Sequence, residues 1–412
     1  SGLHVSWQQI CDWIGRVWGG FLLSHLQCGQ MQHPEPDSSN NQKRHRRPRY
    51  QRYPKGSKEA SIVNSEKLAK LREKYGNAKG GDMFDPHFRE VAETQFSSSG
   101  ERKWPFAGVP TFLDAPFVPD AAKTNFDGLD VALVGVPMDL GVTNRAGARL
   151  GPRAVRNIER IGPYEHVLRM VPGAHCNVAD IGDVPFRSRF SLESCHEDIV
   201  DYFTKIVDAG VIPIAVGGDH SISYSIQRAV GKDRPVGMIH LDAHCDTSGE
   251  YEGAKFHHGG PFRQAVMDGV LDPERTIQIG IRGGAEYLWE FSYDSGMTVI
   301  HAEEVPQIGV EAVIAKAREV VGDGPVYLSF DVDCLDPSFA PGTGTPEIGG
   351  LTSREALAIL RGLKGLDFVG ADVVEVAPQY DATTNTAHVG AQILFEELCL
   401  VTDALKRHKG AA

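Results

Sequence analysis

Residues 236–246 read VGMIHLDAHCD and decide the fold, because an apolar run ends here in closely spaced acids and a histidine. The run Val236–Leu241 has the composition of a strand that is buried on both faces. Similar short runs recur from about Asp130 onward, at Val131–Val136, Val178–Ile181, Val211–Val216, Ile277–Ile281, Val299–Ala302, Val326–Phe330 and Val369–Val376. Their continuous Val, Ile and Leu content predicts eight strands of one sheet that is covered on both sides.

Helical segments separate most of these strands. They are expected at Ser191–Ala209, Ile222–Val230, Val310–Val321 and Ser353–Leu363. Thr352 and Glu355 supply a capping-box signature for the last of them. Strands that alternate with helices predict a three-layer α/β/α domain with a mainly parallel eight-stranded sheet. Because ligands bind at the carboxyl ends of such strands, we look there for the chemistry.

The N-terminal quarter of the chain differs from the rest in composition. We predict that residues 1–104 form a largely irregular extension, with a helix around Val63–Tyr75, and that residues 105–412 form the α/β/α domain. Residues 1–30 are interpreted as cloning-derived or as the product of an upstream start, with a surface amphipathic helix as the alternative. No segment reaches the roughly 18 apolar residues of a membrane span.

Charge is distributed unevenly along the chain. The segment from Lys43 to Lys58 holds eight Lys or Arg and no acid, so with a net charge of −12 this +8 run leaves −20 on the remainder. We interpret the run as a solvated arm that contacts a neighbouring subunit; a nucleic-acid patch is the less favoured alternative. The acidic body suits a cationic substrate.

Seven scattered cysteines form no CxxC pair, which indicates reduced thiols in the cytoplasm and argues against zinc held by cysteine.

Polar residues gather at four strand ends. They lie in Gly217–Ser221 (GGDHS), Asp242–Asp246 (DAHCD), Asp331–Pro337 (DVDCLDP) and at Glu375. In extended chain, residues two apart face the same side, so Asp242, His244 and Asp246 would point one way, as would Asp331 and Asp333. Burying four carboxylates together is costly unless cations accompany them.

Two divalent ions would neutralise the four aspartates, with His220 and His244 completing the ligand set. Carboxylates and imidazoles without a thiolate favour Mn²⁺, and Ni²⁺, Co²⁺ and Zn²⁺ are the alternatives. Two such ions can activate one shared water as a nucleophile. Each motif alone has a plainer explanation: a hydrogen-bonded turn, an N-capping Asp219, or a surface position for His258. Three independent strand ends together favour metal binding.

These segments resemble the metal-binding signatures of the ureohydrolase family, which includes arginase and agmatinase, and the resemblance extends from about Asp130 to Leu398. It implies trimers or hexamers. It also implies one ion on His220, Asp242, Asp246 and Asp331, and a second on His244, Asp242, Asp331 and Asp333. Glu375 would pair with the guanidinium, Asp246 would take a proton from the activated water, and His258 would shuttle a proton; the neighbouring His257 is the alternative to His258.

The resemblance leaves the substrate open. The loop Thr247–Gly253 lacks the asparagine of arginase-like relatives, which argues against arginine. Gly141–Arg149 and Pro341–Glu347 are similar to the agmatinase branch, so agmatine is the expected substrate, with Glu250 or Glu252 either meeting its ammonium or lying in solvent. Free guanidine with nickel is the main alternative, followed by 4-guanidinobutyrate and 3-guanidinopropionate.

Two other classes of protein are weighed against this reading. A zinc deacetylase on a related sheet would need only one metal ion, and would not keep both His220 and Asp246 as ligands. A non-catalytic partner subunit should have lost a ligand or Glu375, and the sequence retains all of them.

Overall fold

In a computed structural model, the described residues are 64–79, 82–86, 88, 89, 92, 106–159 and 161–411. The predictions for residues 1–30, for the basic run 43–58 and for a boundary after residue 104 lie outside them. Contacts divide the chain into the units 1–81 and 82–412. In the first unit, α2 (Ser65–Tyr75) confirms the predicted helix, and the side chain of Asn64 caps it by accepting from the backbone N–H groups of Glu66 and Lys67.

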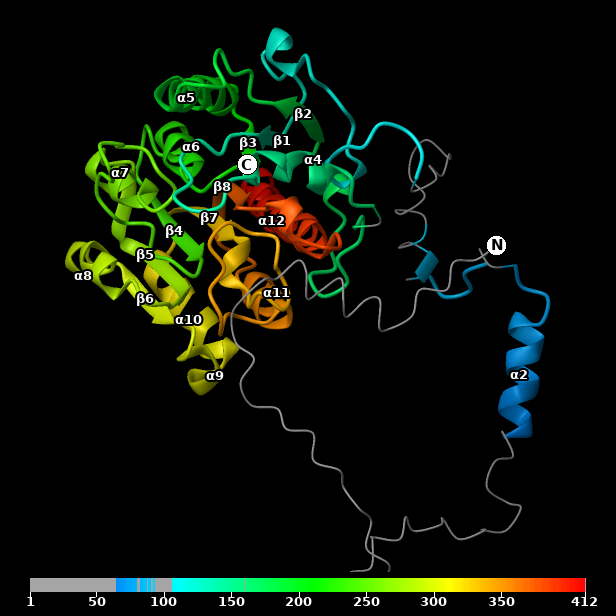
Figure 1. Ribbon diagram of the computed structural model, residues 1–412. Helices are drawn as coiled ribbons and strands as arrows, with labels where there is room; N and C mark the ends of the chain where they lie inside the picture. The colour runs from blue at the N-terminus through cyan, green and yellow to red at the C-terminus, as the bar shows by residue number, and fades with distance from the viewer. Residues whose placement is uncertain are drawn as a thin grey trace, which may run out of the picture. The chain divides into compact units, whose positions relative to one another are not determined.

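The second unit is built on one eight-stranded sheet. Its strands are β1 (Val131–Val136), β2 (Val178–Asp183), β3 (Ile212–Gly217), β4 (Val236–Leu241), β5 (Leu271–Ile281), β6 (Thr298–His301), β7 (Pro325–Asp331) and β8 (Asp367–Val374). They are ordered β2-β1-β3-β8-β7-β4-β5-β6, and every neighbouring pair is parallel. The structure confirms the predicted fold class (Figure 1).

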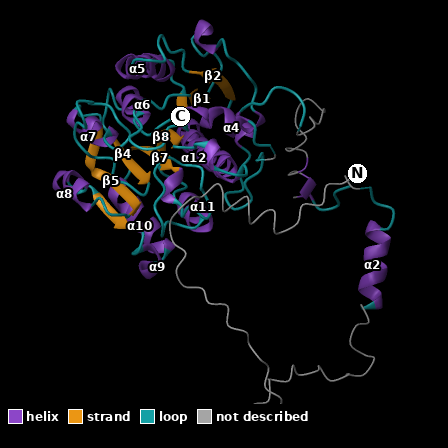
Figure 2. Ribbon diagram, viewed as in Figure 1, coloured by secondary structure: helices purple, strands orange, loops and turns teal. Residues whose placement is uncertain are grey.

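Helices cover both faces of the sheet, as Figure 2 shows. One apolar cluster joins it to α4 (Gly151–Arg156), α10 (Val310–Val321), α11 (Ser353–Gly362) and α12 (Asn385–Ala411). The other joins it to α5 (Leu192–Asp208), α6 (Ile222–Val230) and α7 (Pro261–Met267). The short helices α8 (Glu290–Ser295) and α9 (Val305–Ile308) flank the β6 side. Because both faces are covered, the strands are apolar along most of their length.

Capping residues mark the start of two predicted helices, α5 and α11, whereas α12 has no comparably clear sequence pattern. Ser191 caps α5, and Thr352 and Glu355 form the expected capping box of α11. The sequence analysis did not predict α12, which packs on β8, α4 and α11 together. A helix that is buried on several sides loses the single apolar stripe by which it would be recognised.

Candidate metal centre

Four neighbouring strands in the middle of the sheet carry the predicted site residues at their carboxyl ends. In sheet order these strands are β3, β8, β7 and β4. His220 follows β3, Glu375 follows β8, Asp331 ends β7, and Asp242 follows β4. All four side chains are at least 97% buried. The parallel sheet thus brings together residues up to 155 positions apart in sequence, as His220 and Glu375 are.

His220 points one ring nitrogen at three carboxylates. Its Nδ1 lies 3.0 Å from Asp242 Oδ2, 3.0 Å from Asp246 Oδ2 and 3.3 Å from Asp331 Oδ2. This Nδ1 is buried and has no hydrogen-bond partner among the described residues. The nitrogen and the three carboxylate oxygens that it faces could together hold a cation.

His244 forms a second group with two of the aspartates. Its Nδ1 lies 3.2 Å from Asp333 Oδ2 and 3.4 Å from Asp242 Oδ1. Asp242 therefore turns one oxygen toward each histidine and links the two groups. The side chain of His244 is 27% exposed, so the centre opens to solvent on this side.

The segments that follow β4 and β7 form turns. The sequence analysis was wrong to treat Asp242–Asp246 and Asp331–Asp333 as extended chain. Asp246 has φ of 52°, in the left-handed region, and Val332–Cys334 form a 3-10 turn, so neither segment is extended chain. The Asp331 carboxylate accepts the Asp333 N–H at 2.8 Å, and the Asp242 carboxylate accepts the His244 N–H at 2.6 Å. Side chain-to-backbone hydrogen bonds, and not strand alternation, turn these residues toward one another.

The charge of the cluster is unbalanced. In the described part of the chain, the only ion-pair partners of Asp242, Asp246, Asp331 and Asp333 are histidines. Burial raises the pKa of Asp331 well above its ordinary value, and the charges of Asp333 and Asp242 add to this effect. An oxygen-rich set with two imidazoles fits two hard or borderline divalent ions, which would remove this repulsion.

Glu375 keeps one carboxylate oxygen free beside this cluster. It follows β8 with φ of 63°, and its Oε1 accepts from the His220 N–H at 3.0 Å and lies 2.9 Å from His258 Nδ1. Its Oε2 is buried and has no hydrogen-bond partner among the described residues. A Cβ on Gly344 would lie 3.5 Å from Oε2, in van der Waals contact with it. The free oxygen can accept a donor group of a cationic ligand.

His258, and not His257, lies against Glu375. Its Nε2 lies 2.6 Å from Thr143 Oγ1, whereas His257 Nε2 donates to the Gly249 carbonyl at 2.7 Å. Burial disfavours the imidazolium form of His258. The hydrogen bond to Glu375 and the charges of Glu375, Asp246 and Asp219 outweigh burial and raise the pKa of His258 to about 9. The Thr143 N–H, 3.2 Å from Nε2, can donate to this nitrogen when the ring is neutral, and the closer Thr143 hydroxyl can accept the Nε2–H when the ring is protonated.

Comparisons with known proteins agree with this geometry. Residues 129–399 match the family model described as "Arginase family". A guanidinopropionase from Pseudomonas aeruginosa is 50% identical over 306 residues, which is 73% of this chain and 94% of the relative. A mitochondrial agmatinase from Gallus gallus is 48% identical over 298 residues, 71% of this chain and 86% of the relative. The solved proclavaminate amidino hydrolase from Streptomyces clavuligerus superposes with a TM-score of 0.68 at 36% identity, covering 73% of this chain and all of that chain.

The chain belongs to the arginase family. Membership confirms the resemblance that the strand-end motifs indicated and makes the chain a hydrolase of guanidino C–N bonds. The alternative of a deacetylase on a related sheet is thereby set aside. The roles of individual residues are argued separately, from the contacts of this chain.

Some residues of this arginase-family site carried no signal that the sequence analysis used. His240 lies within β4, and its Nε2 is 2.8 Å from Asp242 Oδ2. Buried Arg282 donates to the carbonyl groups of Asp333, Leu335 and Glu347, which holds the turn after β7. Their positions inside or directly after apolar runs could have identified them, because a polar residue there needs a buried partner.

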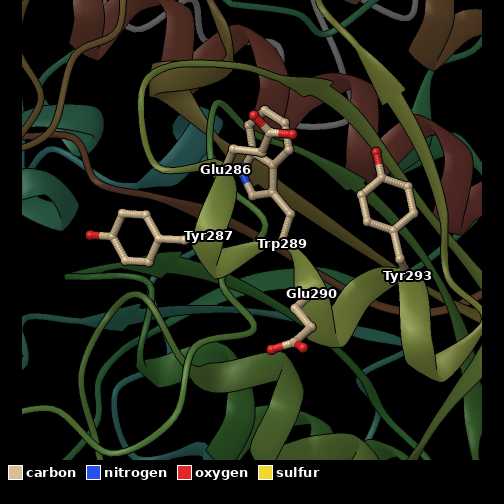
Figure 3. Close-up of a pocket in the computed structure, with 5 residues that line it drawn as sticks. All are labelled: Glu286, Tyr287, Trp289, Glu290 and Tyr293. Carbon is tan, nitrogen blue, oxygen red and sulfur yellow. The ribbon is translucent and has the colours of Figure 1, made fainter.

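A separate surface pocket lies near the β6 side of this arginase-family domain. It measures about 400 Å³ and is lined by Glu286, Tyr287, Trp289, Glu290 and Tyr293 (Figure 3). The Trp289 ring packs on His301 at 4.7 Å between centroids. None of the eight predicted site residues lines the pocket, so it forms no part of the metal centre.

Proposed function

We propose that this chain hydrolyses a small guanidino compound to urea and an amine or ammonia at a two-ion centre. His220, Asp242, Asp246 and Asp331 would hold one ion; His244, Asp242, Asp331 and Asp333 would hold the other. The observation that carries the proposal is that Glu375 and His220, which are joined by a hydrogen bond, each keep a buried polar atom without a partner among the described residues. One group can bind a guanidinium, and the other can bind a metal ion, within a single site.

The ions, when bound, would supply an activated water and offset negative charge. The chain would supply the positioning. Glu375 Oε2 would accept a guanidinium N–H and hold the planar head group over the cluster. Asp246 would take the proton of the attacking water, because its side chain is the most exposed among the four proposed ligands of the first ion.

His258 would return a proton to the leaving nitrogen. Its Nδ1–H is committed to Glu375, so Nε2, beside Thr143 Oγ1, is the atom that can exchange a proton with the substrate. Against the effect of burial, the hydrogen bond to Glu375 and the charge of that carboxylate raise the pKa of His258, which favours the protonated ring. The amine that leaves accepts a proton readily, so a donor of this strength suffices.

The choice of substrate rests on the head group that the relatives share. The guanidinopropionase and the agmatinase named above differ in the charge of the substrate tail but not in the guanidino group. Agmatine is the first substrate to test because the sequence resembles that branch, and 3-guanidinopropionate follows from the 50% identical relative. Free guanidine and 4-guanidinobutyrate complete the panel.

The test measures urea release from each of these four compounds by the full chain loaded with Mn²⁺ or Ni²⁺. We expect two ions per chain and urea from at least one compound. Fewer than two ions, or no urea from any guanidine derivative with either metal, would refute the proposal. The same measurements would decide between manganese, favoured by the donor set, and nickel.

Compartment and assembly complete the proposal. We infer a reducing compartment, because Cys176, Cys195, Cys245, Cys334 and Cys399 are free. The cytoplasm stays a prediction beside the mitochondrial agmatinase of Gallus gallus. None of the described helices could cross a membrane. A trimer or hexamer is likewise a prediction, and sedimentation of the metal-loaded protein would test it.

A further inference from the structure

A row of four buried polar side chains crosses the sheet beneath the proposed metal ligands. The strand pairing aligns Asp372 of β8 with Ser329 of β7, Ser329 with His240 of β4, and His240 with Gln278 of β5. Each of the four is 0% exposed. A polar residue inside an apolar strand is costly unless its hydrogen bonds are made, so the contacts of this row indicate what it does.

The row lies one layer below the metal ligands. Asp331 is two residues beyond Ser329, and Asp242 is two residues beyond His240, so each ligand shares a sheet face with its row member. The row can therefore contact the ligands from the side that faces away from the proposed ions.

On the β7–β8 side, the row determines which nitrogen of His220 carries the proton. The Asp372 carboxylate only accepts, and the Ser329 hydroxyl donates to its Oδ1 at 2.7 Å. The single hydroxyl hydrogen of Ser329 is engaged in this bond to Asp372. Its oxygen must therefore accept from His220 Nε2, 2.8 Å away. His220 then carries its proton on Nε2, which leaves a lone pair on the Nδ1 that faces three aspartates.

On the β4–β5 side, the row fixes the Asp242 carboxylate in the same manner. Gln278 Nε2 donates to the Cys245 carbonyl at 2.6 Å, which sets the orientation of the amide, and also lies 3.0 Å from His240 Nδ1. His240 Nδ1 is therefore an acceptor, and its Nε2–H donates to Asp242 Oδ2 at 2.8 Å. Both nitrogens of His240 are used, so it orients Asp242 and is not itself a ligand.

We propose that Asp372, Ser329, His240 and Gln278 form a positioning layer that sets the tautomer of His220 and the orientation of Asp242 for metal binding. Asp372 is its anchor, because it also accepts from Tyr327 Oη and Ser223 Oγ, both at 2.6 Å. The layer touches neither substrate nor ion. This inference rests on the two-ion centre proposed above.

Asp372→Asn tests the proposal directly. In one orientation, the new amide reverses the direction of the hydrogen bonds that run through Ser329 to His220. The amide nitrogen would replace either Oδ2, which serves two hydroxyl groups, or Oδ1, which serves only Ser329. Placing it at Oδ1 breaks fewer hydrogen bonds. Ser329 would then accept from Asn and donate to His220 Nε2, which moves the imidazole proton to Nδ1 and blocks that ligand atom.

The experiment titrates Mn²⁺ into metal-free full-length protein in competition with a chelator, and records the paramagnetic resonance spectrum of the loaded protein. We expect Asp372→Asn to lower the affinity for one of the two Mn²⁺ ions by about 10- to 100-fold. Substitutions of residues that orient metal ligands have effects of this size. The signal of a spin-coupled Mn²⁺ pair should give way to that of a single ion.

Gln278→Leu tests the other side of the layer and predicts a different pattern. Because Asp242 faces both histidines, we expect both ions to bind more weakly in this variant. Ser329→Ala removes the oxygen that accepts from His220 Nε2 but places no donor in front of that nitrogen. The Mn²⁺ affinity of this variant should therefore lie between those of Asp372→Asn and the wild type. This variant is small and conservative, which keeps the test open if Asp372→Asn folds poorly.

Asp180→Asn is the matched control. Asp180, on β2, is also fully buried and accepts several hydrogen bonds, but its ion-pair partner is Arg156 of α4. We expect this variant to lose stability while its folded fraction binds both ions as the wild type does. If Asp372→Asn and Ser329→Ala bind both ions as tightly as the wild type, the layer is only structural. If the wild type itself binds fewer than two ions, the proposed function fails instead.

Discussion

Two groups of carboxylates on the same sheet, each with buried members, are neutralised in different ways. At the β2 edge, Asp180 accepts from Arg156 Nε at 2.8 Å and Nη2 at 3.0 Å, and Asp183 accepts from Nη1 at 2.6 Å. In the middle of the sheet, four aspartates face three histidines and, in the described part of the chain, no Lys or Arg. The edge group is complete within the chain, whereas the central group requires cations from outside.

This difference separates structural acids from functional ones. A buried carboxylate that has a guanidinium partner and backbone donors contributes to the fold alone. A buried carboxylate cluster that lacks such a partner is destabilising unless something else binds there. The same distinction applies at Glu375, where one oxygen is satisfied and the other is free.

Asp331→Asn should give the largest effect and is the most direct test of the comparison. It removes a ligand of both proposed ions, so we expect kcat/KM for urea release to fall about 1,000-fold or more, since metal-supplied charge stabilisation is worth several kcal/mol. The metal content should fall below two ions per chain. Activity and metal content are measured on the same preparations.

The edge group provides the counterpart, Asp180→Asn. We expect it to lower the free energy of unfolding by about 3 kcal/mol, because it leaves the partly buried Arg156 short of a partner. Activity per folded molecule should not change. If the edge variant lost metal, or if the central variant kept both ions and full activity, the distinction between the two groups would be wrong.

Glu375→Gln should have the next largest effect. The amide keeps the shape of the side chain and can still accept from the His220 N–H, but it loses the charge that would hold a guanidinium. We expect kcat/KM to fall about 100- to 1,000-fold, as for the loss of one preorganised electrostatic group. The metal content should stay at two ions per chain; a loss of metal would show that Glu375 supports the ligands and not the substrate.

The His258–Glu375 pair gives a pH test in the metal-free protein. We expect nuclear magnetic resonance to place the pKa of His258 near 9 in the wild type. In Glu375→Gln the pKa of His258 should fall, because burial is then opposed only by the charges of Asp246 and Asp219. Since the folded-state pKa is raised, the stabilisation from the proton is complete below pH 6.5 and is lost as the pH rises through 9. A wild-type pKa at or below 6.5 would contradict this account.

The same comparison shows how far the sequence could predict the site. The apolar runs and the polar residues at their ends predicted the parallel sheet and all six proposed ligands, because both signals are local in sequence. The assumption of extended chain failed at Asp246, whose φ is 52°, and at the 3-10 turn Val332–Cys334. The hydrogen bonds that produce these turns cannot be inferred from alternation alone.

The positioning layer was missed for a different reason. Ser329 and Asp372 lie within runs that were interpreted as uniformly apolar, and His240 and Gln278 do as well. A single polar residue in a strand indicates that a buried partner is needed, but it does not identify that partner. The row arises from the register of β8, β7, β4 and β5, in which β7 and β4 pair although they are not consecutive in the chain. Register is a property of the folded sheet, so the structure was needed to reveal the row.

The smallest effect is expected for Glu250→Gln and Glu252→Gln, which test the loop between the ligands and His258. The sequence left open whether these acids meet the ammonium of agmatine or lie in solvent, and both are exposed in the structure. An exposed pair contributes less than about 1 kcal/mol, so we expect KM for agmatine to rise less than about 5-fold in either variant. A larger rise, absent with 3-guanidinopropionate, would show that the loop closes over a cationic tail. In that case the distinction between carboxylates with and without a partner in the chain would also apply at the surface, because an exposed acid would gain its ion-pair partner from the substrate.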